Sequence, residues 1–108
     1  MIFIHNNLSR DHDGFLKNSN DWNELIANQI ALEENISLTK EHWDIIYIIR
    51  TFYVNFHTVP TVYILVKAIS RKLGQKKGNS RYLFRLFPQG PIKQAAKIAG
   101  LPKPIICL

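Results

Sequence analysis

The sequence contains a single cysteine, Cys107, and no long apolar run. One cysteine cannot form an internal disulfide, so the composition favours a reducing, cytoplasmic location. No stretch of about 18 apolar residues is present, so the sequence predicts no membrane span. The first residues, MIFIHNNLSRDHDG, lack a basic segment and a small-residue cleavage site, and they predict no secretory signal.

Familiar catalytic and metal-binding patterns are also missing. The four histidines are far apart in the sequence and show no metal-ligand spacing; they are His5, His12, His42 and His57. No Ser-His-Asp arrangement and no glycine-rich phosphate loop is visible. We therefore expect no metal and no cofactor.

Acidic residues are absent from the second half of the chain. The first 44 residues hold all eight acids and three bases, whereas residues 45–108 hold eleven bases and no acid. The formal charges of the two parts are thus −5 and +11. Two interpretations are open: the basic part docks on a nucleic acid or an acidic protein, or the two halves neutralise each other within one fold.

The periodicity predicts a single domain over 1–108 that is mainly α, in an α+β class. A small N-terminal β-hairpin is expected in IFIHNNL, with its turn at Asn6 and Asn7. About five helices follow, over residues 22–34, 40–56, 60–74, 81–87 and 91–99. Asn20 or Asp21 is the expected cap of the first helix. The second helix is apolar nearly all round, so we expect it to be the buried central helix.

The chain ends in GLPKPIICL, which predicts a C-terminal arm over residues 101–108. Pro102 and Pro104 exclude a helix and favour an extended base, and the tip is expected to be flexible. Cys107 on such an arm has three interpretations: a thiol without a role, a redox or intermolecular disulfide site, or a carrier. A carrier thiolate can hold sulfur as a persulfide and must protrude to enter another protein's active site.

Residues 78–108, GNSRYLFRLFPQGPIKQAAKIAGLPKPIICL, closely resemble the C-terminal third of the TusE/DsrC family of sulfur carriers. The shared features are Arg-Tyr-Leu, Leu-Phe-Pro, Gly-Pro, Lys-Gln-Ala, the run Lys-Ile-Ala-Gly-Leu-Pro-Lys-Pro and a penultimate cysteine. DGFLKNSNDW, LTKEHW and LVKAI also look like family segments. The resemblance implies that Cys107 holds the transferred sulfur as a cysteine persulfide.

The family divides on a second cysteine, and here the matching position is Ala96. This departure weakens the alternative of a DsrC-like partner of sulfite reductase and points to the single-cysteine branch. That branch implies a relay for 2-thiouridine formation at the tRNA wobble position. Cys107 would accept sulfur from the TusBCD complex, through its TusD subunit, and pass it toward MnmA with bound tRNA.

Other family positions carry less chemistry. The resemblance implies that Pro102, Lys103 and Pro104 form the arm, and it places docking residues at Arg81, Lys93 and Lys97. A further alternative, from the basic residues around GQKKGNS, is a helix-turn-helix-like nucleic-acid-binding protein. The connection is long for that motif, so no specific DNA binding is expected.

Overall fold

Polar caps begin four of the five helices in the computed structural model, which describes residues 9–104. Asn23, Thr39, Thr61 and Asn79 each accept a hydrogen bond from a backbone N–H of the first helical turn. The helices they open are α1 (Glu24–Glu33), α2 (Lys40–Phe56), α3 (Val62–Leu73) and α4 (Ser80–Leu86). α5 (Pro91–Ile98) instead begins with proline at its first position, and a short 3₁₀ helix (Ser19–Asp21) precedes α1.

A buried histidine joins the start of α2 to the end of α4. The Thr39 backbone N–H donates to Nδ1 of His42 at 3.1 Å, and Nε2 of His42 lies 2.8 Å from the carbonyl oxygen of Leu86. Since Nδ1 accepts, Nε2 carries the proton and donates to that carbonyl. His42 therefore completes a capping box and connects two helices, as a structural residue.

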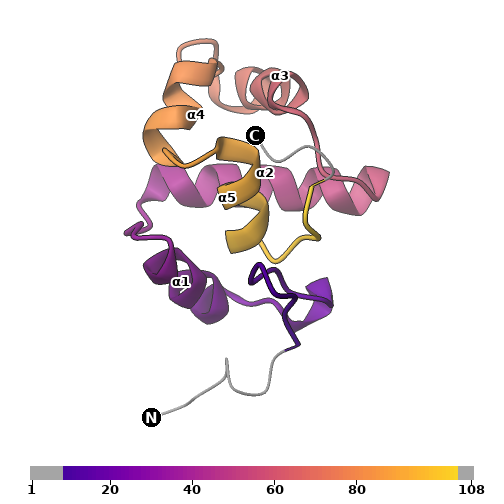
Figure 1. Cartoon of the computed structure of the whole chain (residues 1–108). Helices are drawn as coiled ribbons and strands as arrows, with labels where there is room; N and C mark the ends of the chain where they lie inside the picture. The colour runs from indigo at the N-terminus through magenta and orange to yellow at the C-terminus, as the bar shows by residue number, and fades with distance from the viewer. Residues whose placement is uncertain (1–8, 105–108) are drawn as a thin grey trace.

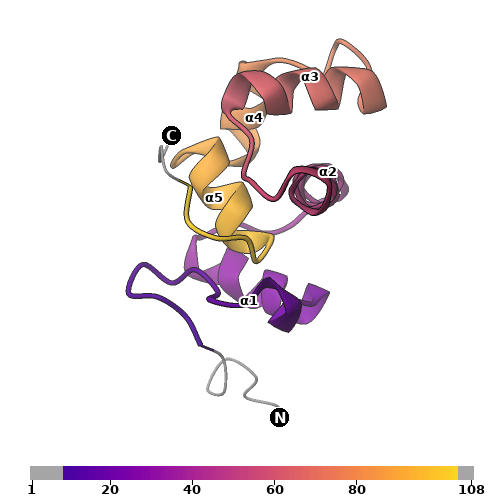
Figure 2. The ribbon, with the colours of Figure 1, turned by 90° about the vertical axis from the view of Figure 1, so that its right-hand side faces the viewer.

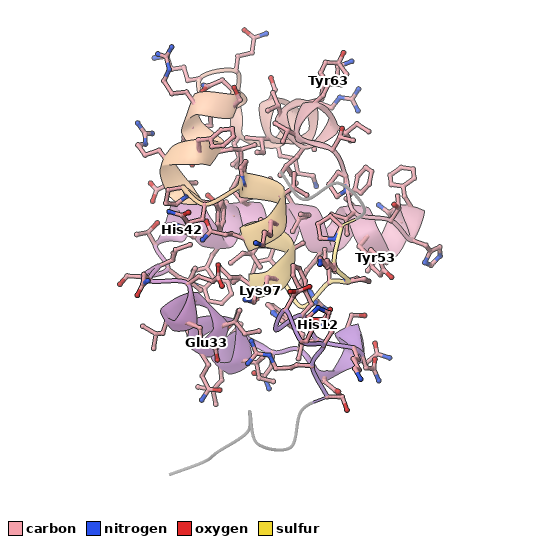
Figure 3. All side chains as sticks on the ribbon, in the orientation of Figure 1. His12, Glu33, His42, Tyr53, Tyr63 and Lys97 are labelled. Carbon is pink, nitrogen blue, oxygen red and sulfur yellow. The ribbon has the colours of Figure 1, made fainter. Side chains whose placement is uncertain are left out.

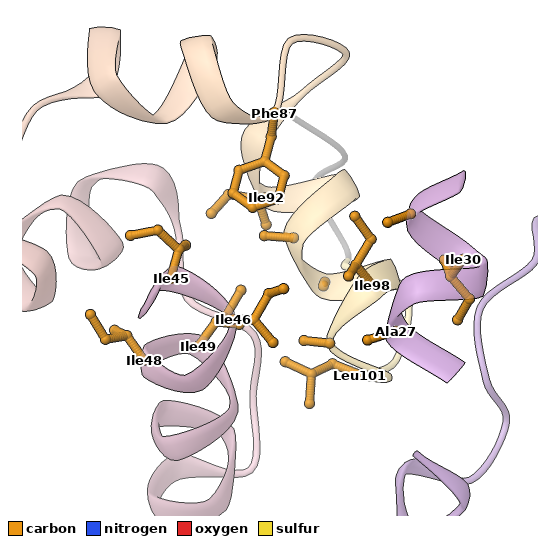
Figure 4. Packing of buried hydrophobic residues seen from close by; sticks show 14 of the residues in the cluster. Ala27, Ile30, Ile45, Ile46, Ile48, Ile49, Phe87, Ile92, Ile98 and Leu101 are labelled. Atoms are coloured by element: carbon orange, nitrogen blue, oxygen red, sulfur yellow. The ribbon is translucent and has the colours of Figure 1, made fainter. Parts of the chain in front are cut away.

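α5 is the centre of the molecule. It lies between α1 on one side and α2 and α4 on the other (Figure 1, Figure 2). Six of its eight residues are buried. Figure 4 shows Ile98 of α5 and the adjacent Leu101 among buried side chains from α1 and α2. The alanines Ala95, Ala96 and Ala99 are fully buried, and their small side chains let neighbouring helices approach closely.

Two expectations about the fold are wrong. Over residues 9–104 the chain has five α-helices and no strand, so the α+β class with an N-terminal hairpin is not correct. The expected hairpin turn, Asn6 and Asn7, lies outside the described residues. The described N-terminal segment has one isolated antiparallel bridge, between Arg10 and Leu16, around a turn in which the Gly14 N–H bonds the Asp11 carbonyl.

The expectation that α2 is the central buried helix is also wrong. α2 buries the isoleucines of one face, but Tyr47, Val54 and Phe56 are 44–68% exposed. The aromatic residues that made its sequence apolar all round therefore lie partly on the surface. Over the described residues, no helix is long and apolar enough to span a bilayer.

Acids of the first half pair with bases of both halves. Arg10 binds the Glu33 carboxylate with two nitrogens, at 2.7 and 3.1 Å. Glu34, one residue further, accepts from Lys97 Nζ at 2.7 Å and from Gln94 Nε2 at 3.1 Å. The end of α1 is thereby fixed to the N-terminal turn and to α5. Of these two ion pairs, Arg10–Glu33 lies within the first half, and Glu34–Lys97 joins an acid of the first half to a base of the second, as the neutralisation interpretation requires.

The Glu34 cluster predicts an acid-sensitive part of stability. Burial raises the pKa of Glu34, but the hydrogen bonds from Lys97 and Gln94 outweigh it, and the net pKa is lowered. The stabilisation is therefore present above the unfolded pKa and lost as pH falls through the folded one. We expect Glu34→Gln to lower the free energy of unfolding at pH 7 by about 1–3 kcal/mol, between exposed and buried pairs.

Urea unfolding of both proteins at pH 7 and near pH 3 checks this expectation. The difference between them should shrink at the lower pH. Asp21→Asn is the matched control, because Asp21 forms no ion pair among the described residues. A difference that stays constant with pH would show that Glu34 acts through packing rather than through its charge.

Candidate functional site: the base of the C-terminal arm

A helix-ending turn at Gly100 sets the direction in which the arm leaves the core. The Gly100 N–H bonds the Lys97 carbonyl at 3.2 Å, and the Leu101 N–H bonds the Ala96 carbonyl at 2.9 Å. This pair of bonds is a Schellman motif, which requires a left-handed residue after the helix. Gly100 provides it with φ of +74°, and Leu101 is buried at 1% exposure.

Two side chains far away in the sequence hold the same turn. Trp22 donates from its indole Nε1 to the Ile98 carbonyl at 2.8 Å, and Arg50 donates to the Ala99 carbonyl at 2.6 Å. The Arg50 guanidinium also lies 3.9 Å from the centre of the Trp22 ring, a cation–π contact. The last carbonyls of α5 are thus capped by a cation at the negative end of the helix dipole.

Burial of Arg50 has an electrostatic consequence. Partial burial lowers the pKa of this guanidinium, but arginine stays charged at any physiological pH. The position is therefore a permanent positive charge held against backbone oxygens. Its signal in the sequence is that Arg50 interrupts the longest apolar stretch, DIIYIIRTFYV. The role of Arg50 at the end of α5 was not predicted.

After the turn, the arm runs back beside α5 and is tied to the N-terminal segment (Figure 1). Lys103 Nζ lies 2.5 Å from Oδ2 of Asp13, and this hydrogen bond is the main cause that lowers the pKa of Asp13. Pro102 is exposed, whereas Pro104 is buried. The described part of the arm, residues 101–104, is therefore packed on the domain rather than projecting from it.

A pocket of about 580 Å³ opens beside the arm. Its walls come from the end of α2, the loop to α3, the first turn of α3 and the arm itself. Tyr53, whose position on α2 is labelled in Figure 3, lines it together with Val62, Ile92 and Pro104. The walls are mainly apolar, so this is a place where an apolar segment can be buried next to the arm.

The expected site residues are not one cluster. Cys107 lies outside the described residues, three positions after Pro104, and three residues extend at most about 11 Å. Lys97 faces inward to Glu34, with 13% of its side chain exposed. Lys93 is exposed on α5, and Arg81 is exposed on α4. The docking roles of these three bases stay predictions.

Among residues 9–104, no group of three metal-ligating side chains could hold an ion.

The fold and the site together define a small five-helix domain over residues 9–104, whose segment 101–104 packs on the domain and leads to the single cysteine of the sequence. A sequence model of the family described as DsrC like protein matches residues 3–108. The chain belongs to this DsrC-like family, which confirms the resemblance found in the sequence.

Curated relatives are similar over their full length. The chain is 55% identical to Sulfurtransferase TusE of Photorhabdus laumondii subsp. laumondii, covering 100% of this chain and 97% of the relative. It is 52% identical to Sulfurtransferase TusE of Escherichia coli strain K12, covering 100% and 99%.

Solved structures of family members share the fold. The NMR structure of Allochromatium vinosum DsrC superposes with a TM-score of 0.85 at 48% identity, over 94% of this chain and 90% of that chain. The crystal structure of the oxidized gamma-subunit of the dissimilatory sulfite reductase (DsrC) from Archaeoglobus fulgidus gives 0.82 at 40% identity, over 94% and 92%.

The Gly100 turn predicts a strong effect of one methyl group. A Cβ added at Gly100 would lie 2.5 Å from Cδ1 of Trp22, in a backbone conformation that L-residues rarely adopt. We expect Gly100→Ala to lower the free energy of unfolding by about 2–4 kcal/mol, from backbone strain plus overpacking. Urea unfolding at pH 7 measures the change.

Gly74→Ala is the matched control for this variant. Gly74 also has a positive φ, of +98°, but a Cβ there meets nothing within 4 Å. It should therefore show only the cost of its own backbone conformation, φ +98° and ψ +161°, about 1–3 kcal/mol, without the collision. Equal effects of the two alanines would mean that the contact between Trp22 and Gly100 does not fix the base of the arm.

Proposed function

We propose that this protein is a sulfur carrier that holds persulfide sulfur on Cys107. The observation that carries the proposal is the position of the only thiol: it follows, by three residues, an arm base fixed by Trp22, Arg50 and Asp13. A carrier needs a thiol that enters two active sites in turn and a base that limits the entropy lost on docking. The name Sulfurtransferase TusE of its relatives supports the same chemistry.

The transfer step needs no external oxidant or reductant. The Cys107 thiolate attacks the terminal sulfur of a donor persulfide, so that a new S–S bond forms on Cys107. The donor's S–S bond breaks, and the donor cysteine leaves as a thiolate. In the second transfer, an acceptor thiolate attacks the terminal sulfur on Cys107 in the same way, and Cys107 leaves as a thiolate.

The finer proposal concerns the relay. Cys107 accepts sulfur from a TusBCD-type complex, at its TusD subunit, and passes it toward an MnmA-type thiouridylase with bound tRNA. The resulting product is 2-thiouridine at the wobble position. Full-length similarity to proteins named TusE supports this assignment. A sulfite-reductase role is less favoured, because the position of the second family cysteine is Ala96, which is fully buried in α5.

The domain boundary is part of the proposal. The chain is one domain over residues 1–108, and the arm was expected to begin at Leu101. Leu101 belongs to the hydrophobic core, so the moving part begins after it, at Pro102 or later. Release of the arm for docking then requires that the bond between Lys103 and Asp13 breaks while the Gly100 turn stays in place.

Cys107→Ser tests the function. The substitution keeps size and polarity but removes the nucleophile, so we expect the fold to be retained and 2-thiouridine to be lost from tRNA. The measurement is the nucleoside content of tRNA from cells in which the variant is the sole copy. Normal thiolation with the serine variant would disprove carriage on Cys107.

Lys93→Glu tests whether the exposed charge on α5 steers docking. We expect a slower association rate with the sulfur-donor complex, and a larger effect at low salt, where screening is weak. Lys97 is unsuitable for this test, because its reversal would also break the Glu34 pair. Lys17→Glu, an equal change on an exposed lysine of the N-terminal segment, is the control. Identical rates for all three proteins would place the docking surface elsewhere.

A further inference from the structure

The basic residues of α3, α4 and the loop between them form no ion pairs with the carboxylates of the described residues. Seven basic residues, and no acid, lie on α3, α4 and the loop that joins them, and we call them the α3–α4 basic surface. These residues are Lys67, Arg71, Lys72, Lys76, Lys77, Arg81 and Arg85. None of the seven forms an ion pair with a carboxylate of residues 9–104.

Lys67 and Arg85 make cation–π contacts, with Tyr63 and Tyr82. The lack of carboxylate partners distinguishes the surface from the bases near the arm. Lys97 and Lys103 are neutralised by Glu34 and Asp13, so the fold uses their charge. Six of the seven bases of the α3–α4 basic surface are exposed, and Lys77 is half-buried. Figure 3 shows nitrogen-tipped side chains that project outward around α3 and α4, away from the labelled Glu33. Glu41 interacts electrostatically with Lys77, and an external anion would relieve the remaining repulsion among these bases.

The α3–α4 basic surface is also hollowed. A pocket of about 470 Å³ lies at the start of α4, lined by Lys76, Asn79, Ser80, Arg81, Tyr82 and Arg85. On α4, Arg81 and Arg85 are four residues apart and therefore lie on one face, with the exposed Phe84 beside them. Two guanidiniums and an aromatic ring on one helix face can bind phosphates and stack on a base.

We infer that the α3–α4 basic surface binds the phosphate backbone of the tRNA. The charge favours a polyanion, and the composition favours RNA over an acidic protein. Protein interfaces are depleted of lysine at their centre and enriched in aromatic residues, whereas this surface carries four lysines with Phe84 exposed among them. The exposed Tyr63 and Ile64 lie in the first turn of α3, away from Arg71 and Lys72 in its last turn. The identification of the RNA as a tRNA rests on the proposed function. The inference that the surface binds RNA does not depend on it.

We expect the α3–α4 basic surface to contact the phosphate backbone of the nucleic acid rather than the base edges in a DNA groove. α3 ends at Leu73 and α4 begins at Ser80, so six residues join them, where a helix-turn-helix has three or four. α4 has only seven residues, about two turns, which is short for a recognition helix. Lysine and arginine contacts to phosphates position a nucleic acid without reading its sequence.

α3 connects this surface with the arm. Its first turn, Val62 and Tyr63, lines the pocket beside Pro104, and its last turn carries Arg71 and Lys72. Twelve residues at 1.5 Å each make α3 about 18 Å long. A tRNA on the α3–α4 basic surface would therefore lie within about 20 Å of the arm's base. The surface would hold the carrier beside the tRNA-bound enzyme while the arm delivers sulfur.

Direct binding of an unmodified tRNA transcript to the full-length protein tests the inference. Fluorescence anisotropy between about 50 and 200 mM salt should show affinity that falls steeply with salt. Arg81→Glu and Lys76→Glu should each weaken binding at low salt about tenfold and reduce the salt slope by about 1. Lys17→Glu, with the same change of charge on the N-terminal segment, should bind like the unaltered protein, and thermal unfolding checks that each variant is folded.

Other outcomes overturn the inference. Absence of tRNA binding at low salt would do so, as would equal loss of binding in the Lys17 control. Tighter binding of a DNA hairpin of the same length would exclude tRNA as the preferred partner. If tRNA does not bind but Arg81→Glu slows sulfur uptake, the surface docks an acidic protein instead.

The test is separable from the proposed function. Cys107→Ser should bind tRNA normally, because the thiol is not part of the surface. Binding without sulfur loading would contradict the carrier proposal alone, and loading without binding would contradict the RNA inference alone.

Discussion

The structure depends on one backbone constraint, the left-handed turn at Gly100 against the Trp22 ring. A side chain at this position would collide with Trp22, so only glycine lets α5 end where it does. The turn buries Leu101 in the core and presents the last carbonyls of α5 to Trp22 and Arg50. The arm therefore leaves a rigid, capped helix end. A carrier gains from a fixed base of this kind, because less conformational entropy is lost when it docks.

α5 connects the Gly100 turn to the rest of the fold. It is the helix that α1, α2 and α4 all contact, and its buried alanines bring those helices close. The ion pairs at the end of α1 and the bond between Lys103 and Asp13 attach the N-terminal segment to the same centre. Acids of the first half thus form ion pairs with Lys97 and Lys103 near the arm, and none with the α3–α4 basic surface among the described residues. The paired bases near the arm stabilise the fold, and the bases of the α3–α4 basic surface are available to bind a partner.

The sequence predicted the parts of this fold that depend on local chemistry. The helices expected over residues 40–56 and 81–87 are observed as α2 and α4, each opened by a polar cap that acts within one helical turn. The cap expected for the first helix, Asn20 or Asp21, was wrong, because Asn23 caps α1. The centre of the fold was missed. Periodicity measures how apolar a helix is, and α2 is richer in large apolar side chains than α5. Ala95 and Ala96 are buried because they are small, and that depends on neighbours that the local pattern does not contain. The inward pairing of Lys97 was missed for the same reason.

The central claim is that the thiol of this arm carries sulfur. The most direct test is the intact mass of the protein after incubation with a cysteine desulfurase and its sulfur relay. If Cys107 carries sulfur, the protein gains the mass of one sulfur atom, and this atom maps to Cys107. The gain is removed by a reducing agent and is absent when the thiol is alkylated first. An unchanged mass under conditions in which the relay proteins themselves load sulfur would contradict it.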